Sequence, residues 1–190
     1  MKGWIIVNGF LYTDKFSEIA EMFVNAATAH HISLEVKSNC EIYSGIFQMD
    51  PSVEKPDFVL FWDKDIILAR YLEISGIPVF NNSKAIEICD DKRKTYTAFL
   101  EAGLPIPPTV SAPMTYENIG FSSLKFVKPI ITKLGYPIIL KEAFGSFGDQ
   151  VYKADDPKML KRLLLDLQQT PFLFQKYIST SHGQDVRIQV

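Results

Sequence analysis

Over the first 80 residues, short runs of consecutive apolar residues alternate with longer segments in which apolar residues recur every three or four positions. Runs that are apolar on both faces are typical of strands covered by helices on both sides of a sheet, and the longer spacing is typical of amphipathic helices. The predicted strands are Trp4–Val7, Leu34–Val36, Phe58–Trp62 and Ile77–Phe80, and the predicted helices are Phe16–His30 and Ile66–Ser75. This order predicts an α/β fold in which residues 1–82 form a doubly wound parallel sheet.

Polar segments follow several of these predicted strands. The turns Asn8–Asp14 and Asp63–Asp65 would lie at the carboxyl edge of the sheet, where folds of this kind bind ligands. The connection from Ser38 to Lys55 is long for its place. Two interpretations of this connection stay open, a substrate loop and a plain surface loop.

The pattern changes after residue 82. A connecting helix is predicted over residues 83–104, because Asn82 or Ser83 can cap its start and Gly103 with Pro105 ends it. Four prolines between residues 105 and 113 then predict a stiff connection without regular structure. Beyond it the pattern predicts a helix over 122–134, strands over 136–141 and 150–153, a helix over 157–168 and a strand over 172–178. Strands joined by a tight turn are antiparallel, so residues 105–178 are predicted to form an α+β unit, and residues 179–190 to begin another.

Composition narrows the class of partner. The chain has 20 Lys and Arg against 22 Asp and Glu, a formal net charge of −2, and no basic run, which argues against binding to nucleic acid or to an anionic membrane. Cys40 and Cys89 lie far apart without the spacing of a metal site, which favours a reducing cytoplasm. No apolar stretch approaches the roughly 20 residues that span a bilayer. The sequence therefore predicts a soluble protein with a small-molecule partner, and it leaves a homo-oligomer open.

Two lysines lie next to apolar residues, where a cation is unusual. Lys92 projects from the middle of an apolar stripe on the predicted helix 83–104, so its stem covers apolar surface or its ammonium meets an anion in a cleft. Lys141 ends the apolar strand Ile138–Leu140 and leads into a turn that contains Gly145, Ser146 and Gly148. A lysine beside a glycine-bearing turn suits a phosphate group, although such a turn between strands is more often a plain hairpin.

The last 19 residues carry a third candidate region. The strand that begins at Phe172 continues into Gln175, Lys176, Tyr177 and Ile178, where main-chain donors and acceptors lie beside apolar side chains, as a flat adenine requires. Polar and apolar residues then alternate from Asp185 to Val190, which predicts a strand with a charged face.

Taken in order, these motifs resemble the ATP-grasp superfamily, and most of all its RimK-type carboxylate-amine (glutamate) ligases. The matching segments are Asn82-Ser83 leading to Asp91-Lys92, Gly103-Leu104-Pro105, Tyr136 to Lys141 with the Gly145–Gly148 turn, Gln175 to Ile178, and Gly183-x-Asp185-Val186-Arg187. The resemblance covers residues 82–190 well, and the first 80 residues only as a generic pre-ATP-grasp domain.

The resemblance implies a nucleotide held between two α+β lobes, ATP and Mg²⁺ as cofactors, and a carboxylate and an amine as substrates. A carboxylate is a poor electrophile, so such ligases form an acyl phosphate that an amine attacks. The implied cofactor-binding residues are Lys92, Lys141, Gly145, Ser146 and Gly148 at the phosphates, Gln175, Lys176, Tyr177 and Ile178 at adenine, and Asp185 at ribose. Arg187 is the implied catalytic residue.

This sequence departs from the family pattern in two ways. Lys176 stands where the family usually has an acidic residue before the aromatic, so a carboxylate contact to adenine is absent. The family's magnesium ligands would lie beyond residue 190, so we expect an amino-terminal fragment that is inactive alone. A non-catalytic nucleotide-binding module of the same fold is the alternative.

Overall fold

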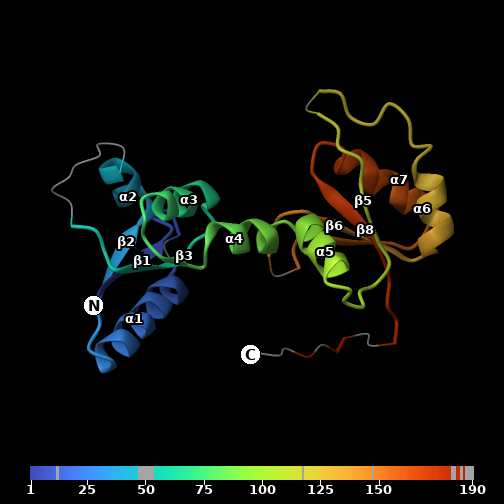
Figure 1. Cartoon of the computed structure of the whole chain (residues 1–190). Helices are drawn as coiled ribbons and strands as arrows, with labels where there is room; N and C mark the ends of the chain where they lie inside the picture. Colours follow the sequence, from blue (N-terminus) through green and yellow to red (C-terminus); the bar gives the residue numbers. More distant parts are fainter. Residues whose placement is uncertain are drawn as a thin grey trace. The chain divides into compact units, whose positions relative to one another are not determined.

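The computed structural model describes residues 1–11, 13–46, 54–116, 118–146, 148–180, 183–184 and 186. The chain divides into two compact units, Met1–Glu87 and Ile88–Val190, each of which we describe by itself (Figure 1). Within the described residues, no helix is long and apolar enough to cross a membrane.

The first unit is built on a parallel four-stranded sheet in the order β2-β1-β3-β4. Its strands are β1 (Lys2–Val7), β2 (Ser33–Ser38), β3 (Phe58–Trp62) and β4 (Val79–Phe80). Strand β1 lies at the centre, paired with β2 through Ile5 and Val36 and with β3 through Ile5 and Leu60. Ile5 and Ile6 point to opposite faces and are both fully buried, so the doubly wound parallel sheet predicted from the sequence is confirmed.

Three helices connect these strands: α1 (Asp14–Ala29), α2 (Asn39–Ile46) and α3 (Ile66–Ile74). Helix α3 begins at the cap Asp65, whose side chain accepts from the Leu68 backbone N–H, and it buries Leu68, Ala69 and Leu72. The sequence predicted a loop from Ser38 to Lys55, and the prediction was wrong for its first part, because Asn39 to Ile46 is helical. Residues 47–53 of that connection lie outside the described residues.

The connecting helix predicted over residues 83–104 is in fact two helices, α4 (Ser83–Asp90) and α5 (Lys92–Glu101). Asp91 separates them in an extended conformation, and its carboxylate accepts hydrogen bonds from the backbone and side chain of Arg93. A short polar side chain that bonds to nearby backbone favours a helix start over a helix interior. The apolar stripe predicted along this helix does not continue across the two helices, since Cys89 and Phe99 are exposed.

The second unit contains an antiparallel sheet in the order β5-β8-β6-β7. The strands are β5 (Thr109–Ser111), β6 (Ile138–Glu142), β7 (Val151–Ala154) and β8 (Phe172–Lys176). The helices α6 (Val127–Leu134) and α7 (Pro157–Asp166) complete the unit. The antiparallel α+β arrangement predicted here is confirmed, but the proline-rich connection contains β5, which pairs with β8 and was not predicted.

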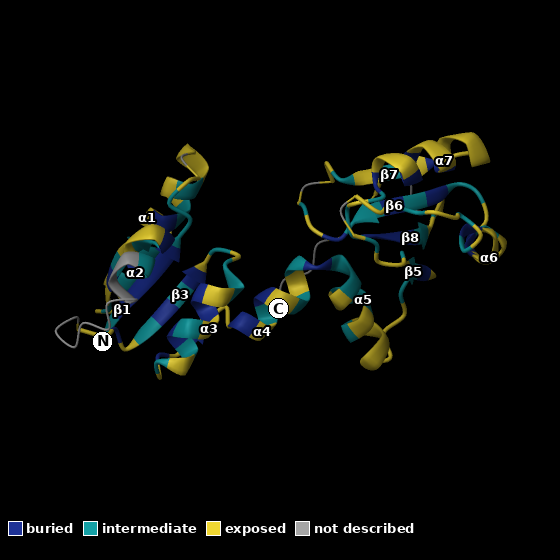
Figure 2. Cartoon of the chain, turned by 90° about the horizontal axis from the view of Figure 1, so that it is seen from above, coloured by how far each residue is buried: buried dark blue, intermediate teal, exposed yellow. Residues whose placement is uncertain are grey.

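Side-chain alternation separates the two faces of this sheet. Ile138, Leu140, Phe172 and Phe174 are buried in one cluster with the apolar residues of α6 and α7 (Figure 2). Lys141 is one position out of phase with them, so its side chain lies on the face that this cluster does not cover. The burial of this cluster on one face of the sheet therefore places the Lys141 side chain on the opposite face.

The separate cores lead to a first prediction. Phe174→Ala should destabilise the second unit by about 3–5 kcal/mol, because it empties a fully buried aromatic site. Trp4 and Trp62, the two tryptophans of the chain, both lie in the first unit. Urea unfolding followed by circular dichroism should therefore shift, whereas the tryptophan fluorescence transition should not.

Phe144→Ala provides the matched control, because Phe144 is 47% exposed in the same unit. An equal shift of the fluorescence transition in Phe174→Ala would show that the two units do not unfold separately.

Candidate functional site

Lys92 is held at both ends against the turn that follows β6. Its backbone N–H donates to the Ala143 carbonyl at 2.9 Å, and its ammonium donates to the Gly145 carbonyl at 2.9 Å. The Ala143 N–H in turn donates to the Pro171 carbonyl at 2.7 Å, which ties the turn to the segment before β8. The first residue of α5 is thereby fixed beside the end of β6.

Lys141 lies within β6, half-buried, and it pairs with Val151 of β7 and Leu173 of β8. Burial, and then repulsion by the nearby Lys92 ammonium, lowers the pKa of Lys141. Glu142, the adjacent acid, belongs to the opposite phase of the strand and accepts a hydrogen bond from the Tyr152 hydroxyl at 2.6 Å. Among the described residues, no carboxylate is paired with the Lys141 ammonium.

Two ammonium groups close together without a carboxylate are unfavourable unless an anion joins them. A half-buried cation whose pKa is shifted by burial and by a like charge is characteristic of functional sites. Lys92 and Lys141, which the sequence singled out separately, are thus brought together by the structure. The arrangement suits a ligand with more than one negative charge.

The turn after β6 requires glycine at Gly145. Its φ is +115°, and a Cβ there would collide with the side chain of Gln150. Gly148 also has a positive φ, +87°, but a Cβ there would meet open space. Ser146 between them is exposed, and Phe147 lies outside the described residues.

The end of β8 is secured to the segment around β5. The Gln175 side-chain amide donates to the Thr109 hydroxyl at 2.8 Å, and the Lys176 N–H donates to the Pro108 carbonyl at 2.9 Å. Thr109 is buried and begins β5, a strand that the proline-rich sequence did not predict. Tyr177 and Ile178 follow the last paired residue, and the Tyr177 ring contacts the Lys153 ammonium 5.2 Å from its centroid.

The structure does not join all the predicted residues in one place. Ile138 of β6 pairs with Lys176, whereas Lys141 pairs with Leu173. The residues predicted to bind adenine and those predicted to bind phosphate therefore lie at different ends of β6. Asp185 and Arg187, predicted at ribose and at the reacting phosphate, lie outside the described residues.

A second cluster occupies the carboxyl edge of the parallel sheet, where the sequence predicted polar turns. The Asp63 carboxylate accepts from the side-chain amides of Asn8 and Asn39, both at 3.2 Å. The Tyr43 hydroxyl donates to Asp65 at 2.9 Å, and burial followed by this contact raises the pKa of Tyr43 to about 12. Asn39 and Tyr43 belong to α2, so the segment taken for a loop contributes to this edge.

Solved structures with a similar fold include a RimK domain ATP-grasp protein and a D-alanine–D-alanine ligase. The chain aligns over 97% of its length with 66% of a RimK domain ATP-grasp protein from Sphaerobacter thermophilus, at a TM-score of 0.70 and 16% identity. A D-alanine–D-alanine ligase from Bacillus anthracis matches 94% of this chain and 58% of its own length, at a TM-score of 0.68 and 20% identity. At this level of identity the likeness defines the fold.

Sequence similarity gives the family. The RimK-like ATP-grasp domain matches residues 89–190. Beta-citrylglutamate synthase B of Danio rerio is 35% identical over 127 residues, which cover 66% of this chain and 30% of that protein. The human N-acetylaspartylglutamate synthase A is 33% identical over 129 residues, covering 67% of this chain and 32% of its own length. The chain belongs to the RimK-like ATP-grasp family, and it spans about a third of the length of these two relatives.

The lysine pair leads to a prediction about stability. Lys141→Met should stabilise the chain at neutral pH by about 0.5–2 kcal/mol, the range of a single stabilising substitution at a functional site, because it removes a desolvated charge beside Lys92. Because the pKa of Lys141 is lowered by folding, its ammonium loses a proton at a lower pH in the folded state than in the unfolded state. The penalty is therefore complete below the folded-state pKa of Lys141, and it disappears as the pH rises through that pKa towards the unfolded value.

Urea unfolding of both proteins at several pH values measures this effect. Lys128→Met is the matched control, because Lys128 is an exposed lysine on α6. A loss of stability in Lys141→Met that exceeds the control would show that Lys141 supports the fold.

Proposed function

We propose that this chain supplies a nucleotide-binding lobe to an ATP-dependent carboxylate-amine ligase. The observation that carries the proposal is the half-buried Lys141 ammonium, which has the Lys92 ammonium beside it and no paired carboxylate among the described residues. Such a lysine pair suits a ligand with more than one negative charge, and membership of the RimK-like ATP-grasp family supports identifying this ligand as the phosphates of ATP. One structure of the same fold, an N5-carboxyaminoimidazole synthetase from Staphylococcus aureus, is complexed with ADP.

In the proposed reaction, a substrate carboxylate oxygen attacks the γ-phosphorus of ATP, and the bond to the β,γ-bridging oxygen breaks to release ADP. An amine then attacks the carbonyl carbon of the acyl phosphate, and phosphate leaves with the formation of an amide. Lys92 and Lys141 would hold the phosphates and balance their charge throughout, which is the main requirement of phosphoryl transfer. We also assign Arg187 to the transferred group.

Adenine would bind at the other end of β6. Lys176 pairs with Ile138, which lies three residues before Lys141 on β6, and this corresponds to about 10 Å along a strand. That separation suits a nucleotide with its base at one end and its phosphates at the other. The Lys176 N–H is already bonded to Pro108, so we assign the adenine contacts to the main chain of Tyr177 and Ile178.

Magnesium would add positive charge at the phosphates of the nucleotide. No group of three or more His, Cys, Asp or Glu side chains that could hold a metal ion occurs among the described residues. The resemblance to RimK-type ligases implies that its ligands lie after residue 190, and we propose that the 190-residue chain alone does not turn over. Cys40 and Cys89 are both free, which supports a reducing cytoplasm as the location.

Calorimetry with Mg-ATP tests the nucleotide site. Lys141→Met should weaken binding at least tenfold, because a hydrogen bond to a charged group contributes about 1.5–3 kcal/mol. The titration should use the 190-residue chain and also a chain that includes any residues encoded after Val190. Lys128→Met should bind like the unchanged protein.

The same Lys141→Met substitution should thus raise stability and lower affinity. ATP binding that is unaffected by Lys141→Met would contradict the proposal, as would the absence of ATP binding in the longer chain. An ADP-release assay on the longer chain, with a panel of carboxylates and amines, then identifies the substrates.

A further inference from the structure

The side chain of Gln175 lies on the same face of the antiparallel sheet as that of Lys141. Gln175 of β8 pairs directly with Ile139 of β6, and directly opposed residues of antiparallel strands share a face. Ile139 lies two positions before Lys141, so the side chains of these two residues also share a face. The half-buried Gln175 amide is therefore placed about 7 Å along the strand from Lys141, towards the segment to which we assign adenine.

A short chain of hydrogen bonds fixes which way this amide faces. The Thr109 hydroxyl donates to the Pro107 carbonyl at 2.8 Å, and the Gln175 amide nitrogen donates to the Thr109 hydroxyl oxygen at 2.8 Å. A hydroxyl has one hydrogen to donate, and here the Pro107 carbonyl accepts it. Thr109 therefore meets Gln175 as an acceptor, so the NH₂ group of the amide faces Thr109 and the amide oxygen faces away.

The position of the Thr109 hydroxyl is itself fixed by the fold. Thr109 is 5% exposed, and its backbone pairs with that of Gln175 in the sheet. Its carbonyl accepts a hydrogen bond from the Tyr96 hydroxyl of α5 at 3.1 Å. The ring of Pro107 restricts the φ of the residue that supplies the carbonyl acceptor. The direction of the Gln175 amide thus follows from backbone that is held on both sides of β5.

The Gln175 side-chain oxygen is left without a protein donor. In the part of the chain that the structure describes, no side chain or backbone N–H donates to this atom. A half-buried amide oxygen gains free energy from a donor, and this one lies on the face that carries Lys141. The proposed nucleotide site therefore offers an acceptor of fixed direction close to the place assigned to the base.

Such an acceptor distinguishes purines by the group at position 6. Adenine carries an amino group there, which is a donor, whereas guanine and hypoxanthine carry an oxygen, which is an acceptor. A rotated amide would offer its NH₂ group to that oxygen, but its own oxygen would then face the lone pairs of the Thr109 hydroxyl. A site built for one hydrogen-bonding pattern rejects an analogue that leaves its polar groups unpaired.

We propose that Thr109 is a positioning residue that makes the nucleotide site selective for a 6-aminopurine over a 6-oxopurine, because it holds the Gln175 amide with its oxygen towards the base. The inference rests on the proposed function for the nucleotide itself. It deepens that function by assigning the choice of base to a hydroxyl that does not touch the ligand.

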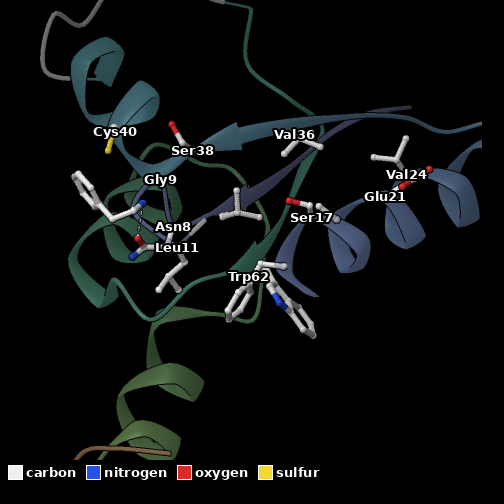
Figure 3. Close-up of a pocket in the computed structure, with 14 residues that line it drawn as sticks. Asn8, Gly9, Leu11, Ser17, Glu21, Val24, Val36, Ser38, Cys40 and Trp62 are labelled. Atoms are coloured by element: carbon white, nitrogen blue, oxygen red, sulfur yellow. Dashed lines mark hydrogen bonds between the residues drawn. The ribbon is translucent and has the colours of Figure 1, made fainter. Parts of the chain in front are cut away.

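A cavity of about 730 Å³ in the first unit, between α1 and the parallel sheet, also has the volume of a small-molecule site (Figure 3). Glu21 is among its lining residues, and no lysine or arginine is among the described residues that line it. The cavity is therefore unsuited to a triphosphate. Lys141→Met separates the two locations, since a nucleotide in this cavity would not depend on Lys141.

Calorimetry with Mg-ATP and Mg-ITP, on the two chains that test the nucleotide site, measures the selectivity. ITP has the ribose and phosphates of ATP, but an oxygen at position 6 and a hydrogen on N1. The unchanged protein should bind ATP about tenfold more tightly than ITP. Thr109→Val keeps the shape of the side chain without its hydroxyl and should lower this ratio about fivefold, because the released amide can turn towards the 6-oxygen.

Three further variants separate positioning from a structural effect. Thr109→Ser keeps the hydroxyl and should preserve the ratio, and Gln175→Leu removes the amide and should lower the ratio as Thr109→Val does. Lys141→Met should weaken ATP and ITP by the same factor, because it removes a phosphate contact. Circular dichroism checks that each variant folds.

Equal binding of ATP and ITP by the unchanged protein, an unchanged ratio in Thr109→Val or in Gln175→Leu, or an equal fall of the ratio in Thr109→Ser would each overturn this inference. The ligase proposal would stand in all of these cases, provided that ATP binding depends on Lys141. Absence of ATP binding in the longer chain would instead contradict the ligase proposal, and this inference with it.

Discussion

The two hydrogen bonds of Lys92 to the turn after β6 are the contacts on which the candidate site depends. The backbone bond to Ala143 fixes where α5 begins, and the ammonium bond to Gly145 fixes where the charge lies. Since α5 starts at a residue capped by the buried Asp91, the position of Lys92 is set by the fold and not by a flexible stem. The fold thereby keeps two like charges near each other, an arrangement that disfavours the empty protein and favours a bound polyanion.

The two units differ in the sign of the charged groups described above, a lysine pair in the second unit and the Asp63 carboxylate in the first. In the second unit, β6 carries Lys141, whose ammonium is paired with no carboxylate in the part of the chain that the structure describes. In the first unit, the amide donors at the edge of the sheet are bonded to asparagine oxygens, and a carboxylate lies behind them. A parallel sheet edge is often a place for phosphate, but here the Asn39 side chain of α2 and the Asn8 side chain after β1 accept from the Gly9 and Phe10 N–H groups.

Much of this architecture could be predicted from the sequence. Runs such as Phe58–Trp62 predicted strands because a short continuous apolar pattern is typical of a strand in a covered sheet, and in β3 the residues Val59 and Phe61 are buried. The lysines Lys92 and Lys141 could also be found, since a cation among apolar residues is unusual. Strand β5 could not, because it depends on pairing with the distant strand β8, whereas the helix break at Asp91 has a local signal, a side chain that caps α5, which the continuous helical spacing concealed.

Strand β5 has a consequence for how copies of this protein meet one another. It forms one outer edge of the antiparallel sheet, it is three residues long, and Pro107, Pro108 and Pro113 lie near its two ends. Proline offers no backbone N–H to a neighbouring strand, and short outer strands give a poor template for pairing between molecules. The other edge, β7, is four residues long and carries the charged Lys153. The proline-rich segment therefore limits edge-to-edge aggregation at high protein concentration.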